Sequence, residues 1–435
     1  MIHFYALATL DDSQRKRLLR RAETQIDELT ERVRPIIQAV HERGDEALLE
    51  FTARFDRVQL PPEKLRVGHD EIEQAHHALD PSVYAAIQHA IRNVRTFHER
   101  QMPHEQWFTQ VAPGVLAGEK ITPITSVGLY VPRGKGAFPS VMYMLATPAS
   151  IAGVPRIVVC TPPASDGTVD PASLVAADLC GVHEIYRVGG AQAIAALAYG
   201  TDTIGRVHKI TGPGSGYVAA AKRLLYGTVD VGLPAGPSES IILADASADP
   251  ELLARDLLIE AEHGPDSSSL LVTDSRSLAE AVMALLPPKM AELPEWRQAF
   301  CRTVFEEPQG TGGIVLAANM DEAIAFVNEY APEHLSVQVS EPFALLPRLR
   351  NAGEILLGPY TPFCTGNYCV GTNAVLPTGG FAHTFSSTTV HDFLKRTGIA
   401  YLTAEGYPPV SETTRILAEF EGFPAHANAV TRRFS

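Results

Sequence analysis

The chain has 435 residues, of which 45% are hydrophobic and 20% charged, and its formal net charge is −14 at pH 7. This length exceeds what one compact core supports, so we expect two or more domains in a globular protein of ordinary composition. The acidic charge argues against a nucleic-acid partner, which requires clustered Lys and Arg, and no apolar run is long enough for a membrane span.

The start of the chain and its cysteines favour a reducing compartment. Residues 1–14 lack a basic segment followed by an apolar stretch, so we expect no signal peptide and a cytoplasmic location. No second cysteine pair completes a zinc knuckle beside Cys364 and Cys369. We therefore expect free thiols at all five cysteines, which are Cys160, Cys180, Cys301, Cys364 and Cys369.

The first hundred residues have the periodicity of helices. Residues 31–44 place four apolar side chains on one face before Gly44 ends the pattern, namely Val33, Ile36, Ile37 and Val40. Residues 46–56 and 81–101 continue this pattern. The sequence therefore predicts a helical N-terminal region.

After Ser126 short apolar runs alternate with helical stretches. The predicted strands are 127–132, 156–160, 184–190 and 208–214, followed by 239–245, 268–274, 312–319, 334–340 and 353–359. This alternation is typical of βαβ units with right-handed crossovers, so the sequence predicts an α/β fold with parallel sheets. In such sheets ligands bind at the carboxyl ends of the strands.

Two glycine-rich turns lie at the ends of predicted strands, in residues 131–140 and 212–218. Neither matches the GxGxxG pattern of a dinucleotide-binding loop, and ordinary strand-to-helix turns explain them equally well. Their position at strand ends is what favours a nucleotide site.

A helix predicted from Asp249 to Gly264 carries a carboxylate and a histidine three residues apart, Glu260 and His263. This spacing puts both on one face. The pair is common on solvated helices, and a histidine in the last turn also complements the helix dipole. The same spacing supplies two metal ligands in helical proteins.

Three further segments carry candidate functional residues. Glu333 and His334 adjoin the start of a predicted strand, and both are suitable for acid–base catalysis. Residues 365–379 form a Gly- and Asn-rich stretch with few charges, and His426 follows Glu421 by five positions. Each has a simpler reading as a solvated turn, a loop or a surface histidine, so none decides the function alone.

Taken together, these segments resemble the histidinol dehydrogenase family. The matching pieces occur in the family's order over about residues 25–431: VGLYVPRG, ATPASIAG, VGGAQAIAALAYGT, KITGPG, LPAGPSE, EAEHGPDS, YAPEHL, GTNAVLPT and AHANAV. The resemblance implies an NAD-dependent homodimer with one Zn²⁺ per subunit, in which the partner's tail completes the active site. It implies oxidation of an alcohol to a carboxylate through an aldehyde, in two hydride transfers. The nominal substrate is L-histidinol, in the last steps of L-histidine biosynthesis.

The resemblance also implies two Rossmann-like parallel-sheet domains, a helical N-terminal region and a small C-terminal tail domain. We expect the boundaries at 1–25 for the N-terminal segment, 26–125 plus 235–325 for the first α/β domain, 126–234 plus 326–372 for the NAD-side domain, and 378–435 for the tail.

Site residues follow from the same resemblance, position by position. The resemblance implies that Glu333 activates water for the second oxidation and that His334 takes the hydroxyl proton. The substrate-binding set is Ser238, Glu260, His263, His334, Asn367, Glu421 and His426. The NAD positions are Tyr130, Gln192 and Ser215, and the metal positions are Glu260, His263, Asn367 and His426.

The chain departs from the family pattern at four positions. Glu260 stands for glutamine and Asn367 for aspartate, so a carboxylate and an amide exchange places and the formal charge of the ligand set is unchanged. We hypothesise that the metal is retained with its negative charge moved to another ligand. Ser215 stands for asparagine, where a hydroxyl still forms hydrogen bonds.

Ala374 stands where the family has a histidine that helps to hold the polar end of the substrate. Its loss points to a different small alcohol, such as a sulfopropanediol, with His383 a candidate for compensation. A non-catalytic NAD-binding paralogue is the third hypothesis. Retention of Glu333, His334 and the two histidine ligands argues against it.

Overall fold

The computed structural model describes residues 1–19, 26–133 and 136–434. Residues 20–25 of the expected N-terminal segment, and Gly134 and Lys135 of the turn at 131–140, lie outside the described residues. The chain divides into two compact units. The first unit comprises residues 1–101 and 125–393, and the second comprises 102–124 and 394–435.

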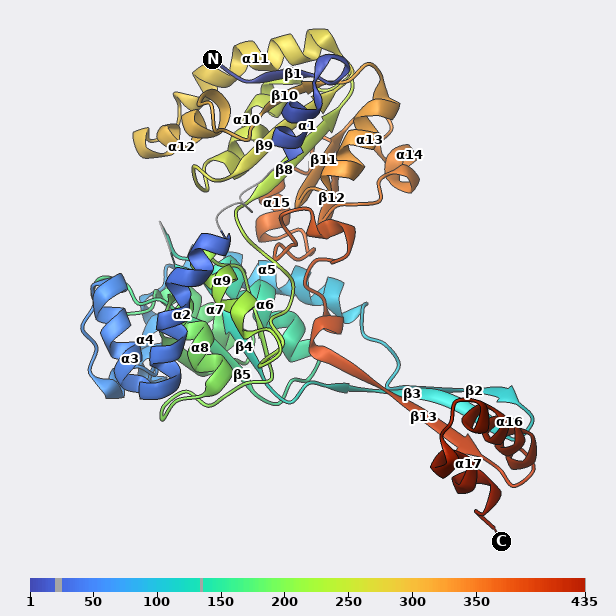
Figure 1. The fold of residues 1–435 in the computed structure, drawn as a ribbon. Helices are drawn as coiled ribbons and strands as arrows, with labels where there is room; N and C mark the ends of the chain where they lie inside the picture. The colour runs from blue at the N-terminus through green and yellow to red at the C-terminus, as the bar shows by residue number, and fades with distance from the viewer. Residues whose placement is uncertain (20–25, 134–135, 435) are drawn as a thin grey trace. The chain divides into compact units, whose positions relative to one another are not determined.

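A six-stranded parallel sheet lies at the centre of one part of the first unit (Figure 1). Its order is β1 (Phe4–Ala6), β10 (Gly313–Leu316), β9 (Ser268–Thr273), β8 (Glu239–Ala244), β11 (His334–Gln338) and β12 (Glu354–Leu357). Helices cover both faces, so successive strand residues pack into opposite cores. Ile242 packs with Leu257, whereas its neighbour Ile241 packs with Phe326.

The helices around this sheet pack into two hydrophobic cores, one on each face of the sheet. The helices that share a core with Ile242 are α10 (Pro250–Ala261), α11 (Arg276–Met290), α12 (Glu295–Glu306) and α15 (Phe363–Tyr368). Those on the other side are α1 (Asp12–Leu19) and α13 (Met320–Tyr330). The short α14 (Pro342–Leu345) follows β11.

A four-stranded parallel sheet lies at the centre of the other part of the first unit. Its order is β6 (Glu184–Arg187), β5 (Ile157–Thr161), β4 (Val127–Tyr130) and β7 (Lys209–Thr211). The helices of this part are α2 (Ile26–Arg43), α3 (Asp45–Phe51), α4 (His69–Ala78), α5 (Pro81–Glu99), α6 (Pro139–Ile151), α7 (Pro171–Leu179), α8 (Gly190–Tyr199) and α9 (Gly216–Leu225). Val33 and Val40 of α2 are fully buried against this core, as their spacing predicts.

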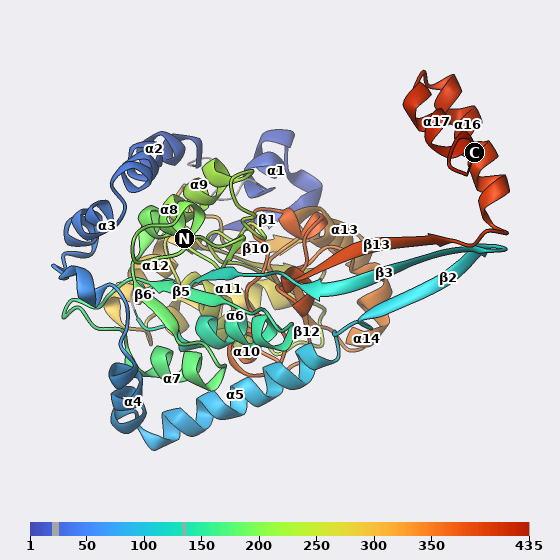
Figure 2. The same cartoon turned by 90° about the horizontal axis from the view of Figure 1, so that it is seen from below.

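The second unit is an antiparallel ribbon with two helices (Figure 2). The ribbon has the order β13 (Leu394–Leu402), β3 (Val115–Pro123) and β2 (Gln106–Ala112). β13 and β3 pair in continuous register from Leu394 opposite Pro123 to Leu402 opposite Val115. The helices are α16 (Tyr407–Phe420) and α17 (Pro424–Thr431).

The expected α/β fold class with two parallel sheets and a helical N-terminal region is confirmed. The grouping of segments differs from the expected boundaries. Strands β11 and β12 pair beside β8, although residues 326–372 were expected with 126–234. Residues 102–124 pair with the tail, which was expected to begin at 378. Periodicity locates strands, but it does not say which distant strands become neighbours.

Among helices in the described ranges, none is both long and apolar enough to cross a membrane. The five cysteines are free; Cys160, Cys180 and Cys301 are buried, and Cys364 and Cys369 are half-buried.

Candidate active site

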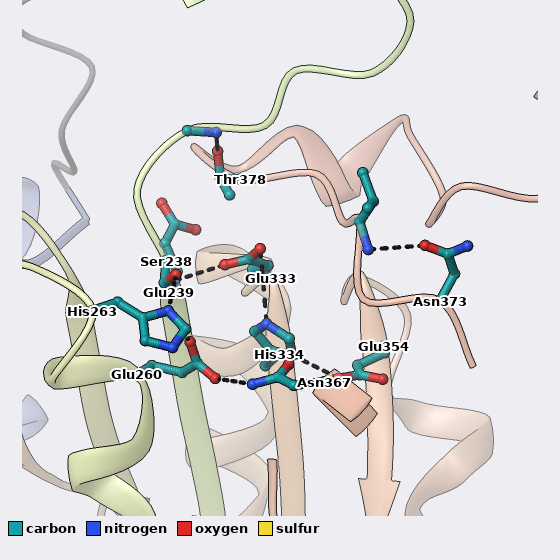
Figure 3. A network of polar contacts seen from close by, with 12 residues as sticks. Ser238, Glu239, Glu260, His263, Glu333, His334, Glu354, Asn367, Asn373 and Thr378 are labelled. Carbon is teal, nitrogen blue, oxygen red and sulfur yellow. Dashed lines mark hydrogen bonds and ion pairs between the residues drawn. The ribbon is translucent and has the colours of Figure 1, made fainter. Parts of the chain in front are cut away.

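The expected catalytic residues gather at the amino ends of β8, β11 and β12 (Figure 3). His334 begins β11, Glu239 begins β8 and Glu354 begins β12. The sheet register sets His334 beside both neighbouring strands, opposite Ser240 and Glu354. In this sheet the candidate residues therefore lie at the ends of the strands opposite to their carboxyl ends.

Glu333 lies in the short connection between α13 and β11, where the helix ends in a left-handed Ala331. Its Oε2 accepts a hydrogen bond of 2.8 Å from the backbone N–H of Glu239. Burial, above all, raises the pKa of Glu333 well above its ordinary value, the neighbouring Glu260 adds to this, and His334 opposes it. A buried carboxyl group with a raised pKa is suited to exchange protons near neutral pH.

His334 is buried among carboxylates. Its Nδ1 lies 2.6 Å from Oε1 of Glu354, and its Nε2 lies 3.8 Å from Oε1 of Glu333. Burial lowers the pKa of His334, but Glu260, Glu333 and Glu354 together raise it to about 10. A cation bound among these carboxylates would lower the pKa of His334, because a nearby positive charge disfavours protonation of the imidazole. The cluster is thus suited to a cationic ligand.

Glu260, His263, Asn367 and Ser238 form the adjoining half of the cluster. The α10 helix ends at Ala261, so His263 lies in the turn after it rather than in its last turn. Nδ2 of Asn367 donates a hydrogen bond of 2.8 Å to Oε1 of Glu260. Nδ1 of His263 lies 3.2 Å from Oε2 of Glu260. Oγ of Ser238 lies 2.9 Å from Nδ1 of His263. These contacts bring together four of the predicted site residues.

The surroundings of Glu260 favour the negatively charged form of its side chain. Its side chain is completely buried, and burial alone would raise its pKa. The charges of His263 and His334 and the hydrogen bonds from Asn367 and Ser238 outweigh burial and lower the pKa of Glu260 below its ordinary value. Its Oε2 has no hydrogen-bond partner among the described residues. A buried, charged and incompletely bonded oxygen fits a cation ligand.

The expected metal ligands belong to different units of the chain. Glu260, His263 and Asn367 are contributed by the first unit, and His426 lies in α17 of the second. Glu421, the C-cap of α16, is also in the second unit, and both its side chain and that of His426 are exposed. Within the described ranges, no group of three or more His, Cys, Asp and Glu side chains is arranged to hold a metal ion. The first unit therefore offers an incomplete set of one carboxylate, one imidazole and one amide.

The expected NAD residues lie at the carboxyl ends of the four-stranded sheet. Tyr130 ends β4, and its hydroxyl accepts a hydrogen bond of 3.0 Å from the backbone N–H of Gly190, at the start of α8. A Cβ on Gly190 would lie 2.7 Å from Oε1 of Gln192, so Gln192 folds back over the same turn. Ser215 is exposed at the N-cap of α9, and its side chain forms no cap hydrogen bond. Free N–H groups at helix starts suit a pyrophosphate.

His383 does not take the place of the histidine that the family has at the position of Ala374. Ala374 is half-buried in the loop after Asn373, whose side chain donates to the carbonyl of Met144 over 2.6 Å. His383 is exposed, and its Nε2 lies 3.2 Å from the carbonyl oxygen of Glu329. The hydrogen bond of His383 is thus made to the end of α13 and not to the cluster around His334.

Two acidic residues at these sites were not predicted from the sequence. The first is Glu354, which contacts His334. The signal in the sequence that could have identified it is an acidic residue at the start of a buried strand. Asp56 ends the π-helix Thr52–Asp56. Burial is the main cause that raises the pKa of Tyr130, and the charge of Asp56 adds to it. Nothing in the pattern around Asp56 singles it out, because its neighbourhood depends on how α3 packs against the sheet.

Replacing Asp56 with asparagine should stabilise the protein increasingly as pH rises. Burial raises the pKa of Asp56 from 3.8 to about 6, so the folded state disfavours its charge and loses stability as pH rises through that window. The pKa change corresponds to about 3 kcal/mol, which solvent screening of this half-buried group reduces to roughly 1 kcal/mol. The Tm of the variant minus that of the parent should therefore increase by roughly 1 °C between pH 4.5 and pH 8.

The exposed Asp166 provides the control for this measurement. Hydrogen bonds from Thr168 lower the pKa of Asp166, so removing its charge should not give a Tm difference that grows with pH. A Tm difference for Asp56→Asn that stays constant across the range would contradict the assignment.

Comparisons with known proteins agree over the whole chain. The family model described as histidinol dehydrogenase matches residues 19–434. A histidinol dehydrogenase from Synechocystis sp. is 51% identical over 434 residues, covering 100% of this chain and 99% of the relative. A histidinol dehydrogenase homolog from Cereibacter sphaeroides is 52% identical over 430 residues, covering 99% of this chain and 97% of the relative.

A solved structure supports the same assignment at the level of the fold. The crystal structure of histidinol dehydrogenase from Elizabethkingia anophelis matches with a TM-score of 0.92 and 32% identity, covering 99% of this chain and 98% of that chain. Family model, relatives and structure thus point the same way. The chain belongs to the histidinol dehydrogenase family, whose members are NAD-dependent oxidoreductases acting on a CH–OH group.

Proposed function

We propose that this protein is an NAD-dependent, zinc-containing dehydrogenase that oxidises a small polar alcohol to a carboxylate through an aldehyde, with L-histidinol as the nominal substrate. The observation that carries this proposal is the buried pair Glu333 and His334 at the start of β11, adjoining Glu260, His263 and Asn367. An acid and a base side by side permit two successive proton transfers on one bound substrate.

Each step has a place for its proton. In the first oxidation Nε2 of His334 accepts the hydroxyl proton as the carbon loses hydride, which leaves a carbonyl. In the second, Glu333 accepts a proton from the water that adds to the aldehyde before the second hydride leaves. NAD supplies the hydride acceptor when bound, and Tyr130, Gln192 and Ser215 are the residues that would orient it.

For the metal we propose Zn²⁺ held by Glu260, His263, Asn367 and His426, one ion per subunit. The donor set of two imidazoles, one carboxylate and one amide oxygen suits zinc. Oε2 of Glu260 accepts no hydrogen bond from the described residues and has the ring of His263 3.2 Å away, which supports a cation at this point. When bound, the ion supplies Lewis acidity and a template for the substrate. The exchange of carboxylate and amide between Glu260 and Asn367 keeps the charge of the set.

Metal content should depend on Glu260. Removing its buried carboxylate takes away the only formal negative charge in the set, so Glu260→Ala should lose most of the zinc that the parent retains after purification, measured by elemental analysis. The matched control is Glu262→Ala, two residues on, where the carboxylate instead lies 3.7 Å from Arg297. Full zinc occupancy in Glu260→Ala would disprove the ligand assignment.

We further propose a cytoplasmic homodimer in which the partner subunit's tail completes the site. The support is the family resemblance, together with the placement of Glu421 and His426 in the second unit and of the other candidates in the first. Such an exchange would explain why the ligand set of one unit is incomplete.

Ala374 supports a second substrate hypothesis, oxidation of another hydroxylated compound such as a sulfopropanediol. The carboxylates around His334 argue the other way, since they favour a cationic amino alcohol. NAD reduction by zinc-supplemented protein across L-histidinol, amino alcohols and sulfonated alcohols separates these. NADH from an amino alcohol supports the proposal, and NADH from sulfonates alone supports the second hypothesis. NAD binding without any turnover would indicate a non-catalytic paralogue.

A further inference from the structure

We infer that Glu354 is a positioning residue that holds His334 with a proton on Nδ1, so that Nε2 faces the substrate as the free acceptor. This inference rests on the proposed role of His334 as the base. It adds a residue that the sequence resemblance does not include. The inference is carried by the sheet register and by the contacts of one buried carboxylate.

The register of β11 and β12 fixes the pair. His334 and Glu354 are opposite each other in parallel strands, and the backbone N–H of Glu354 donates to the carbonyl of Glu333 over 3.0 Å. Nδ1 of His334 and Oε1 of Glu354 are 2.6 Å apart, and their side chains are only 3% and 4% exposed. Both residues are anchored by strand backbone, so the contact does not depend on a mobile loop.

The carboxylate of Glu354 is itself held from its other side. Its Oε2 accepts a hydrogen bond of 3.1 Å from Oγ1 of Thr372. A Cβ on Gly366 would lie 2.7 Å from Oε1, so the glycine leaves just enough room for the carboxylate in this orientation. Glu354 is therefore locked in the position that receives the Nδ1 proton.

The opposite nitrogen of His334 is left for chemistry. Nε2 lies 3.8 Å from Oε1 of Glu333, which is beyond hydrogen-bond distance. The ring edge meets Phe363 in a T-shaped contact with 5.9 Å between the ring centroids, which restricts the orientation of the imidazole. When the imidazole is in its neutral form it carries one proton, and a hydrogen bond from Nδ1 to Glu354 then leaves Nε2 as the acceptor.

This arrangement defines the first oxidation at the level of atoms. The substrate O–H bond breaks and its proton forms a bond with Nε2 of His334, while the C–H bond breaks and its hydride passes to NAD⁺. The products are a carbonyl, NADH and an imidazolium. The negative charge of Glu354 stabilises that imidazolium.

The kinetic test compares Glu354→Leu with Glu354→Gln. Leucine removes the acceptor, so kcat for the alcohol should fall roughly 10- to 100-fold with KM changed less than about threefold. Glutamine still offers an amide oxygen to the Nδ1 proton, so it should restore part of kcat. Thr372→Val, which removes only the second partner of Glu354, should reduce kcat less than either. A Glu354→Leu variant with parental kcat, a loss confined to KM, or a glutamine variant no better than leucine would overturn the inference.

A spectroscopic arm does not require turnover. A proton held between Nδ1 of His334 and Glu354 should give a resonance far downfield of the amide region in the proton NMR spectrum of the parent. The resonance should be absent from Glu354→Leu and from His334→Gln, and present in Thr372→Val. If the parent forms no NADH with any alcohol but shows this pattern, the proposed function fails and the positioning contact stands. A resonance unchanged in Glu354→Leu would reject the contact.

Discussion

Replacing His334 with alanine should reduce kcat for alcohol oxidation by roughly 10²- to 10⁴-fold, the contribution expected of a well-placed general base. The reason is geometric. His334 begins β11, its Nδ1 is engaged with Glu354, and its Nε2 is the remaining acceptor beside Glu333. Alanine leaves no group at this position to take the hydroxyl proton. Steady-state NADH formation at saturating alcohol and NAD measures the loss.

The control for this substitution is His383→Ala. His383 is exposed and its ring contacts the carbonyl of Glu329, so its loss should leave kcat within about twofold of the parent. The Tm of His334→Ala should be recorded as well, because the side chain is buried. A folded His334→Ala protein that retains more than about a third of the parental kcat would exclude His334 as the base.

Replacing Glu333 with glutamine should block mainly the second oxidation. Glutamine keeps the size of the side chain and an oxygen that accepts from the N–H of Glu239, but it does not take a proton from water. The first NADH should form at near the parental rate, and the second should slow roughly 10²- to 10⁴-fold. The aldehyde should accumulate, which trapping with a carbonyl reagent or chromatography detects.

Glu239→Gln tests whether this effect belongs to Glu333 alone. Glu239 is a neighbouring buried carboxylate whose Oε1 accepts from the N–H of Gly379. Its substitution should leave the second oxidation no slower relative to the first than in the parent. Complete conversion to acid at the parental rate by Glu333→Gln would count against the role assigned to Glu333.

Much of the fold is predictable from the sequence because strand and helix periods are local. The buried runs that became β8, β9 and β11 were located to within a few residues, and Val33 and Val40 were placed on the packed face of α2. The pairing of β3 with β13 was not predicted. Residues 124–393 separate the two segments in the chain, and nothing local in either sequence identifies its partner.

The site shows the same division between local and distant information. Glu260, His263, Glu333 and His334 were ambiguous individually, and the resemblance assigned roles to them. These four residues lie close together at the amino ends of the strands because of the order in which the strands pair. Glu354 was missed for that reason, since its contact with His334 exists only through the register of β11 with β12. The departures at Glu260 and Asn367 were visible in the sequence, and the structure adds their 2.8 Å hydrogen bond.

The proposed function requires one site around Glu333 and His334 to carry an alcohol through two oxidations to the carboxylate. The most direct measurement is the amount of NADH formed per molecule of limiting alcohol by purified, zinc-supplemented protein, with the carbon product identified. The account predicts two NADH and one carboxylate for each alcohol consumed. One NADH with free aldehyde as the product would contradict it.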